Sequence, residues 1–308
     1  MSNHSFVIAD VFTDRHFGGN QLAVFTDGSM LDTDTMQNIA REMNYSETTF
    51  LLPPEKGGDY RVRIFTPAHE LPFAGHPIVG TGFVIAATGL KRLSSPSTEL
   101  KLETGVGIIN VDVAIKDGKP GHTRMSQPLP EVRGRFEDTE RLAKALGLER
   151  SRIDSTELPV EPIYNGIEVL IVPVDSLASV KRLEIDAMAL RQISSEVGAE
   201  TVLVFTRETV EPSSTVHCRV AAPAAGVYED AATGSANGPL GYYLVRHKLV
   251  DLKPTTLIVS EQGYEMKRPS KLHIEVDLDT KSERVTAVRV GGGVVISGRG
   301  EIILGSGA

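Results

Sequence analysis

The feature that most constrains the fold of this 308-residue chain is the almost entirely apolar run from Ile78 to Ala87. Pro77 suits the first position of a helix, because its missing N–H would have no partner there. Gly89 can adopt the left-handed conformation that ends a helix. A helix without a polar face has to be buried on every side. The run therefore predicts a central helix that begins at Pro77, with a domain built around it.

The residues just before this run, Gly75 and His76, would lie at the N-terminus of the buried helix. The first backbone N–H groups of a helix have no intrahelical partner, and together with the helix dipole they bind anions. A core helix that simply begins with a turn accounts for the same residues. This stretch therefore predicts either an anion site or a structural turn.

Composition narrows the class of protein. The length of 308 residues is enough for about two domains, and with 41% hydrophobic and 23% charged residues the chain can build full cores and is not disordered. The net charge of −8, without any basic block, argues against nucleic acid or an anionic membrane as partner. The apolar run is too short to cross a bilayer and no signal peptide is recognisable, so we expect a cytoplasmic protein. The single cysteine, Cys218, is expected to be a buried packing residue rather than a nucleophile.

Hydrophobic periodicity predicts strands around the central helix in the first half of the chain. A helix capped by Thr33 or Asp34 and ending near Met43 is also expected there. The predicted strands are 6–11, 22–25, 46–52, 60–65, 100–102, 106–113 and 122–125. After a polar linker at 128–138, helices are expected at 139–146 and 186–197, and strands at 166–173, 201–205 and 215–220.

The two halves of the chain resemble each other. In both, a strand containing an arginine, Arg63 or Arg219, precedes a glycine turn and an apolar segment. Gly75 precedes Gly234 by 159 residues, and Glu70 precedes Glu229 by the same distance. This pattern predicts an internal duplication. The expected domains are 1–127, completed by a C-terminal strand at about 285–308, and 128–284, with a cleft between them that receives both helix starts.

Three motifs together resemble the phenazine-biosynthesis isomerase family: Ser46–Phe50, Pro72–Pro77 and Asp230–Ser235. The similarity extends along nearly the whole chain and includes the glycine turn Phe17–Asn20, although Gln21 stands where the family usually has proline. The resemblance implies an α+β, diaminopimelate-epimerase-like fold. Its two similar domains each have a curved, mostly antiparallel sheet around a buried helix.

The resemblance also restricts the chemistry. In the related epimerases a cysteine precedes each helix-start glycine, and the two cysteines exchange a proton across one carbon. Here these positions hold Ala74 and Thr233, which are not acids or bases at neutral pH. Epimerisation by two thiols is therefore excluded. The family's alternative proton carrier is the glutamate of the first motif, Glu47.

Glu47, His76 and Asp230 are the candidate catalytic residues. An isolated glutamate is usually a solvated surface charge, but Tyr45 and Phe50 flank Glu47 and predict partial desolvation, which would raise its pKa. The resemblance favours His76 as a group that holds substrate and relays a proton, although it could be a core or capping histidine. It favours Asp230 as the partner of the substrate's amino group, although aspartate is also common in turns.

The candidate substrate-binding residues include His76 and Asp230 again. The backbone N–H groups near Gly75 and Gly234 would bind a carboxylate, and the Ser235 hydroxyl would donate to the substrate unless it only caps its helix. Asn20 is a further candidate contact. We expect no metal site, because the eight histidines are scattered, and no nucleotide site, because no glycine-rich loop has phosphate-binding spacing. No cofactor is expected.

These expectations combine into one functional hypothesis with two alternatives. The resemblance implies a cofactor-independent isomerase that acts on trans-2,3-dihydro-3-hydroxyanthranilate or a related cyclic amino acid, with Glu47 moving the proton. The alternatives are an amino-acid racemase or epimerase with Glu47 and His76 as opposed bases, and a non-catalytic protein that binds an anionic metabolite. A homodimer is expected from the resemblance alone.

Overall fold

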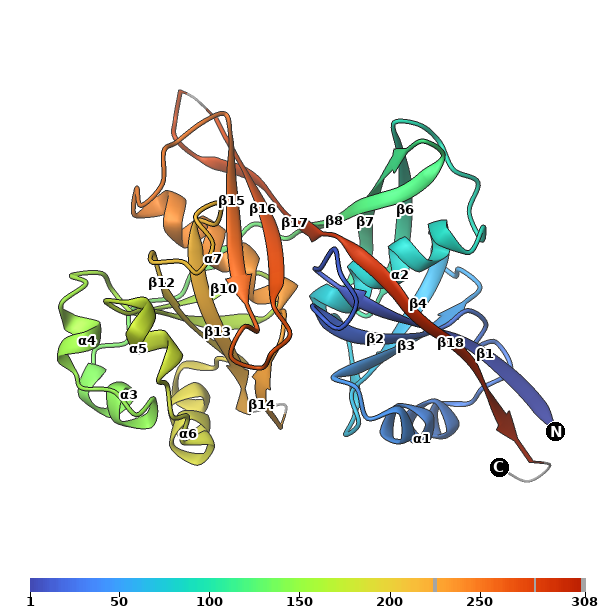
Figure 1. Ribbon diagram of the computed structural model, residues 1–308, viewed down its shortest axis with the longest axis horizontal. Coiled ribbons are helices and arrows are strands. Elements are labelled where there is room, and N and C mark those ends of the chain that lie inside the picture. The colour runs from blue at the N-terminus through green and yellow to red at the C-terminus, as the bar shows by residue number, and fades with distance from the viewer. Residues whose placement is uncertain (224–225, 280, 306–308) are drawn as a thin grey trace. The chain divides into compact units, whose positions relative to one another are not determined.

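The computed structural model describes residues 1–223, 226–279 and 281–305. The chain divides into two compact units. Unit 1 comprises Met1–Ser126 and Gly291–Ala308, and unit 2 comprises Gln127–Val290. Figure 1 labels the helices and strands of both units.

Unit 1 is built from strands and two helices. Its elements are β1 (Ser2–Val11), β2 (Asn20–Phe25), α1 (Thr33–Met43), β3 (Glu47–Leu52), β4 (Tyr60–Phe65), β5 (Glu70–Leu71), α2 (Gly75–Ala87), β6 (Ser97–Thr104), β7 (Gly107–Lys116), β8 (Lys119–Gln127) and β18 (Val294–Leu304). Strand β1 pairs antiparallel with both β2 and β18. Strands β2 and β3 are parallel, as are β4 and β6. The pairs β3–β4, β4–β5, β6–β7 and β7–β8 are antiparallel.

Unit 2 repeats this plan with additional helices. Its elements are β9 (Glu131–Val132), α3 (Thr139–Ala145), α4 (Ser151–Asp154), β10 (Glu161–Tyr164), β11 (Glu168–Pro173), α5 (Leu177–Lys181), α6 (Ala187–Val197), β12 (Thr201–Thr206), β13 (Val216–Ala222), β14 (Val227–Asp230), α7 (Gly234–Arg246), β15 (Thr255–Gln262), β16 (Ser270–Leu278) and β17 (Val285–Gly292). Strands β11 and β12 are parallel, as are β13 and β15. The pairs β10–β11, β12–β13, β13–β14 and β15–β16 are antiparallel.

The strand order of the two units confirms the internal duplication. The first parallel pair is connected through α1 in unit 1 and through α5 and α6 in unit 2, and the second pair through α2 or α7. Parallel neighbours need such crossovers, whereas antiparallel neighbours are joined by short turns. The sheets are mostly antiparallel, as predicted, and the two parallel pairs of each unit lie where its helices cross over.

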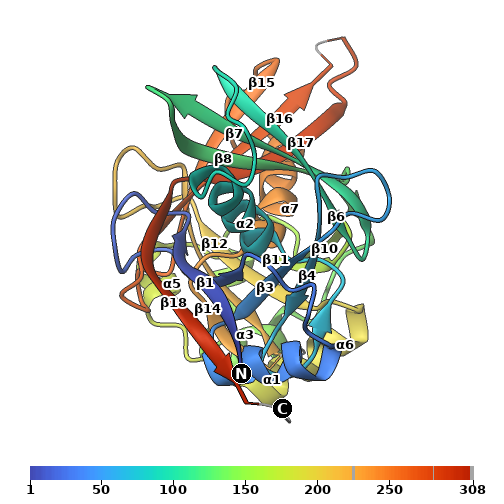
Figure 2. The ribbon, with the colours of Figure 1, turned by 90° about the vertical axis from the view of Figure 1, so that its right-hand side faces the viewer.

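Helix α2 lies among the strands of unit 1, as Figure 2 shows, and contacts β1, β2, β3, β6, β7 and β18. All its residues from Gly75 to Ala86 are buried, as the apolar run predicted. A Cβ atom at Gly82 would lie 2.6 Å from Val111 Cγ1, and one at Gly241 of α7 would lie 2.5 Å from Ile274 Cγ2. Glycine at these positions therefore lets each central helix pack closely against a strand of its own unit.

The predicted helix ends are partly correct. Gly89 follows the end of α2 with φ +77°, as expected for the residue that stops a helix. However, α2 begins at Gly75 rather than at Pro77, which occupies the third helical position, where the N–H also lacks a partner. The cap of α1 is Asp32, whose side chain accepts from the Thr35 N–H, rather than Thr33 or Asp34.

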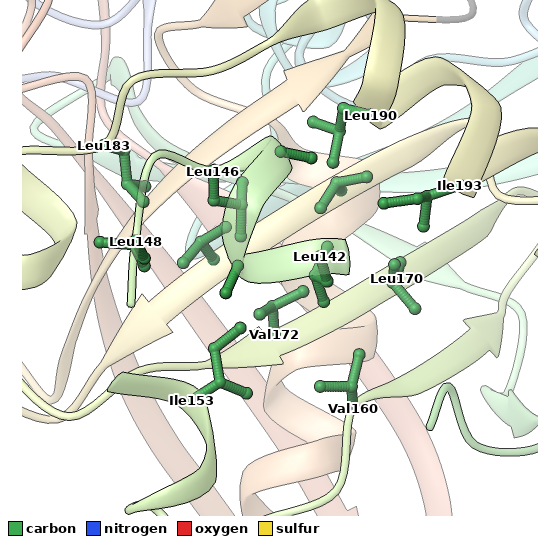
Figure 3. Packing of buried hydrophobic residues seen from close by; sticks show 14 of the residues in the cluster. Leu142, Leu146, Leu148, Ile153, Val160, Leu170, Val172, Leu183, Leu190 and Ile193 are labelled. Carbon is green, nitrogen blue, oxygen red and sulfur yellow. The ribbon is translucent and has the colours of Figure 1, made fainter. Parts of the chain in front are cut away.

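Separate hydrophobic clusters support the outer helices. In unit 1, Phe25 stacks on Phe50, which meets Phe65 edge-on beneath α1. In unit 2, residues of α3 and α6 pack against β11, and Figure 3 shows Leu142 of α3 and Leu190 of α6 among them. Cys218 is fully buried, as predicted. In the described part of the chain, no helix is both long and apolar enough to span a membrane.

Candidate active site

Glu47 is the first residue of β3, and the strand pairing carries it into the interior of unit 1. Strand β3 lies parallel to β2, with Glu47 beside Leu22. The Glu47 side chain is only 14% exposed, and its Oε2 lies 3.4 Å from Nε2 of His76. The carboxyl group therefore does not point into bulk water. The catalytic hypothesis requires this, because a proton carrier has to face the substrate and not the solvent.

His76 is the second residue of α2, and its side chain is only 4% exposed. Nδ1 of the ring lies 3.2 Å from the side-chain nitrogen of Asn20. Burial lowers the pKa of His76 to about 3, and a hydrogen bond to the Gln21 backbone acts weakly in the opposite direction. The ring is therefore neutral at neutral pH, and its contact with Glu47 is not an ion pair.

A neutral histidine next to a carboxyl group can share one proton with it. With the ring proton on Nε2, His76 donates toward the Glu47 carboxylate. Because the Asn20 amide nitrogen only donates, Nδ1 accepts from it, which places the ring proton on Nε2, toward Glu47. The 3.4 Å separation is long for a hydrogen bond in the unliganded site, and such contacts commonly shorten when substrate binds.

Asn20 connects this pair to the glycine turn before β2. The Ser46 hydroxyl donates to the side-chain oxygen Oδ1 of Asn20 at 3.4 Å. The side-chain nitrogen Nδ2 of Asn20 contacts His76. Unit 1 therefore brings together four of the predicted site residues: Asn20, Glu47, Gly75 and His76. Ser46 belongs to the same network, and although it lies in the first motif beside Glu47, it was not among the predicted site residues.

Unit 2 brings together Asp230, Gly234 and Ser235, the remaining predicted site residues. Asp230 is the last residue of β14, and its Oδ2 accepts from the Thr233 hydroxyl at 2.6 Å. Gly234 and Ser235 form the first turn of α7 and are buried. The sequence analysis predicted these residues but not the side chains that hold them.

Two buried amides hold the first turn of α7. Gln127 donates to the Gly234 carbonyl at 2.8 Å, and Asn165 donates to the Ser235 carbonyl at 3.0 Å and to Gln127 Oε1 at 2.8 Å. The Ser235 carbonyl would ordinarily accept from the N–H four residues later, but that residue is Pro239, which has none. Asn165 therefore supplies the donor that the helix lacks.

The two central helices begin differently from the other longer helices. Side chains of Asp32, Asp138 and Asp186 cap α1, α3 and α6. Helices α2 and α7 begin after Ala74 and Thr233, and neither start has a side-chain cap. Their first N–H groups are therefore not satisfied by a capping side chain, which leaves them available to an anionic ligand.

Matching ion pairs brace the hairpin before each of these helices. Arg63 on β4 forms a bidentate pair with Glu70 at 2.7 and 2.6 Å. Arg219 on β13 forms the same pair with Glu229 at 2.7 and 2.8 Å. The arginines and glutamates that repeat in the sequence therefore form equivalent ion pairs between neighbouring strands in the two units.

The duplicated scaffold does not carry duplicated chemistry. Thr48 of β3 pairs with Phe65, two residues after Arg63, and Val202 of β12 pairs with Ala221, two residues after Arg219. Thr48 and Val202 are therefore equivalent positions in the two units. The residue before each of them is Glu47 in unit 1 and Thr201 in unit 2. Only unit 1 therefore has a carboxyl group at the start of this strand.

The fold first defines a class of protein. The crystal structure of a hydroxyproline epimerase from Agrobacterium vitis matches 98% of this chain and 91% of its own length, with a TM-score of 0.69 and 14% identity. At this identity the match shows the fold alone, which is that of the diaminopimelate-epimerase-like proteins.

The particular family follows from closer matches. The family model of the phenazine biosynthesis-like proteins matches residues 9–300, and the chain belongs to this family. A phenazine biosynthesis protein of the PhzF family from Bacillus anthracis has a crystal structure with a TM-score of 0.88 and 27% identity, covering 99% of this chain and 100% of its own. A trans-2,3-dihydro-3-hydroxyanthranilate isomerase from Pseudomonas fluorescens is 38% identical over 98% of this chain and 100% of its own length. The predicted family and fold are confirmed, and the protein is an isomerase.

Proposed function

We propose that this isomerase moves a proton within trans-2,3-dihydro-3-hydroxyanthranilate or a related cyclic amino acid, without a cofactor, and that Glu47 carries the proton. The observation that carries the proposal is the Glu47 carboxyl, only 14% exposed, at 3.4 Å from a neutral, buried His76 at the uncapped start of α2. The relative from Pseudomonas fluorescens, named for this reaction, supports the choice of substrate.

In the proposed mechanism, Glu47 takes the proton from the hydroxyl-bearing ring carbon. It returns that proton to another carbon on the same face of the ring, and the resulting enol tautomerises to a ketone. One carboxyl group suffices, because the proton does not cross the ring and the atomic composition of the substrate is unchanged. His76 keeps the carboxyl in place and shares its proton between the two steps.

The remaining residues are proposed to bind the substrate. The backbone N–H groups at Gly75 and Gly234 would hold its carboxylate and stabilise charge that develops toward it. Ser235 would donate a hydroxyl hydrogen bond, Asp230 would accept from the amino group, and Asn20 would orient His76.

An epimerase with Glu47 and His76 as opposed bases is less well supported. Two opposed bases have to lie on opposite faces of the reacting carbon, with that carbon between them. The side chains of Glu47 and His76 instead approach each other to 3.4 Å, which favours a single shared proton.

Isotope exchange tests the proposal. The enzyme is incubated with trans-2,3-dihydro-3-hydroxyanthranilate in heavy water, and the ring protons are followed by NMR. Glu47→Gln is expected to lower turnover by about 10²–10⁴-fold, because a positioned acid–base group contributes that much. Glu42→Gln, on the exposed side of α1, makes the same change in charge and serves as the matched control.

Three outcomes would contradict the proposal. Full activity of Glu47→Gln would remove the proton carrier. Deuterium at an α-carbon with loss of optical rotation would indicate an epimerase, and binding without any proton exchange across cyclic amino acids would indicate a non-catalytic protein. The expected homodimer stays a prediction, which light scattering of the purified protein would test.

A further inference from the structure

The Thr233 hydroxyl lies between a carboxyl group and an amide in unit 2. Its oxygen is 2.6 Å from Asp230 Oδ2 and 2.9 Å from Nε2 of Gln262. An amide nitrogen only donates, so the hydroxyl accepts from Gln262. The single proton of Thr233 is therefore directed to Asp230.

Gln262 is itself fixed in one orientation. Its Oε1 accepts from the Thr233 backbone N–H at 3.0 Å and from Asn237 Nδ2 at 3.1 Å. Its Nε2 also donates to the Asp230 carbonyl at 2.8 Å. A flipped amide would place its oxygen against that carbonyl and its nitrogen against two donors, so the network, in which Gln262 and Asn237 are fully buried, permits only one arrangement.

The duplication shows that the scaffold does not require this network. At the spacing of 159 residues that relates Gly75 to Gly234, the places of Asp230 and Thr233 are held in unit 1 by Leu71 and Ala74. Neither of these side chains can form the hydrogen bonds, yet α2, like α7, begins at its glycine without a side-chain cap. The network is therefore a feature of unit 2 and not a requirement for starting the central helix.

We propose that Thr233 and Gln262 are positioning residues that hold Asp230 as a hydrogen-bond acceptor toward the substrate. Gln262 orients the Thr233 hydroxyl, and the hydroxyl fixes one oxygen of the Asp230 carboxylate. This inference rests on the proposed function, in which Asp230 accepts from the substrate's amino group.

A double-mutant cycle separates this role from a structural one. Thr233→Val keeps the shape of the side chain but removes the donor, and is expected to lower kcat/KM about tenfold, as for the loss of a hydrogen bond to a charged group. Thr233→Ser keeps the hydroxyl and should stay within about twofold of wild type. In an Asp230→Ala background, Thr233→Val should have almost no further effect, because Thr233 acts only through Asp230.

Two kinetic results would overturn the inference. One is an equal loss from Thr233→Val with and without Asp230, and the other is a loss in Thr233→Ser as large as in Thr233→Val. Crystal structures of both variants give a readout that does not depend on turnover. The Asp230 carboxyl should move in Thr233→Val and stay in place in Thr233→Ser, and an unmoved carboxyl in both would refute the inference. If the wild-type protein is inactive on the substrate, the proposed function is contradicted. The crystal structures of the two Thr233 variants would still test whether Thr233 holds the Asp230 carboxyl in place.

Discussion

The most informative stability prediction concerns the proline inside α7. Pro239 leaves the Ser235 carbonyl without an intrahelical donor, and Asn165 supplies one at 3.0 Å. Asn165 therefore stabilises α7 because residue 239 is proline. The effect of Asn165→Ala should therefore depend on which residue occupies position 239.

The magnitude follows from the burial of these groups. Asn165 is fully buried and Ser235 nearly so, so Asn165→Ala leaves a buried carbonyl without a partner. An unsatisfied buried group of this kind costs about 1–3 kcal/mol. In a Pro239→Ala background the new N–H can bond to the Ser235 carbonyl, and this part of the loss should disappear. Losses common to both backgrounds, such as the cavity and the bond to Gln127, cancel in the comparison.

Native-state hydrogen exchange of the α7 amides measures this difference directly. It reports the opening free energy of one helix even when the two units unfold separately. The expected coupling between positions 165 and 239 is about 1–3 kcal/mol. Equal losses from Asn165→Ala in both backgrounds would refute the account, because Asn165 would then support α7 in some other way.

Three further predictions concern titration and burial. The pKa of His76 falls to about 3 on folding, so the unfolded chain binds a proton at a higher pH than the folded chain does. The free energy of unfolding should therefore fall by about 1.4 kcal/mol per pH unit from about pH 6.5 toward pH 3. Denaturation at several pH values should show a smaller slope in His76→Gln. Arg219→Met leaves the 10%-exposed Glu229 unpaired and should cost about 3–5 kcal/mol in denaturant unfolding, whereas Arg63→Met, whose partner Glu70 is 39% exposed, should cost about 0–1 kcal/mol. Burial raises the pKa of the Cys218 thiol to about 12, so at pH 8 thiol reagents should label it only as fast as the chain opens, and rapid labelling of the native protein would contradict this.

The features of the fold that depend on local sequence were predicted well. The apolar run of α2 left no alternative to a buried helix, and glycine marked its end. The repeats of Arg63 and Glu70 around Gly75 predicted the duplication, because each of these residues has the same structural task in both units. The start of α1 was misplaced by one or two residues, since Asp32, Thr33 and Asp34 are all good capping residues and only the backbone conformation selects among them.

The supporting residues of the candidate site could not be predicted in the same way. Gln127 and Asn165 are 38 residues apart, and Gln262 lies 29 residues after Thr233. An isolated amide carries no periodicity or motif, and its role depends on which strands bring it to a helix start. Pro239 was a usable signal, because a proline beyond the first turn of a helix leaves a carbonyl that another group has to satisfy.

The uncapped starts of α2 and α7 have a practical consequence for the laboratory. Small carboxylates such as acetate, formate or citrate resemble the part of the substrate that these helix ends are proposed to bind. Buffers made from these acids should therefore act as weak competitive inhibitors and raise the melting temperature of the protein. Kinetic work is better begun in zwitterionic buffers, and crystals grown from citrate or formate offer a first chance to observe an occupied helix start.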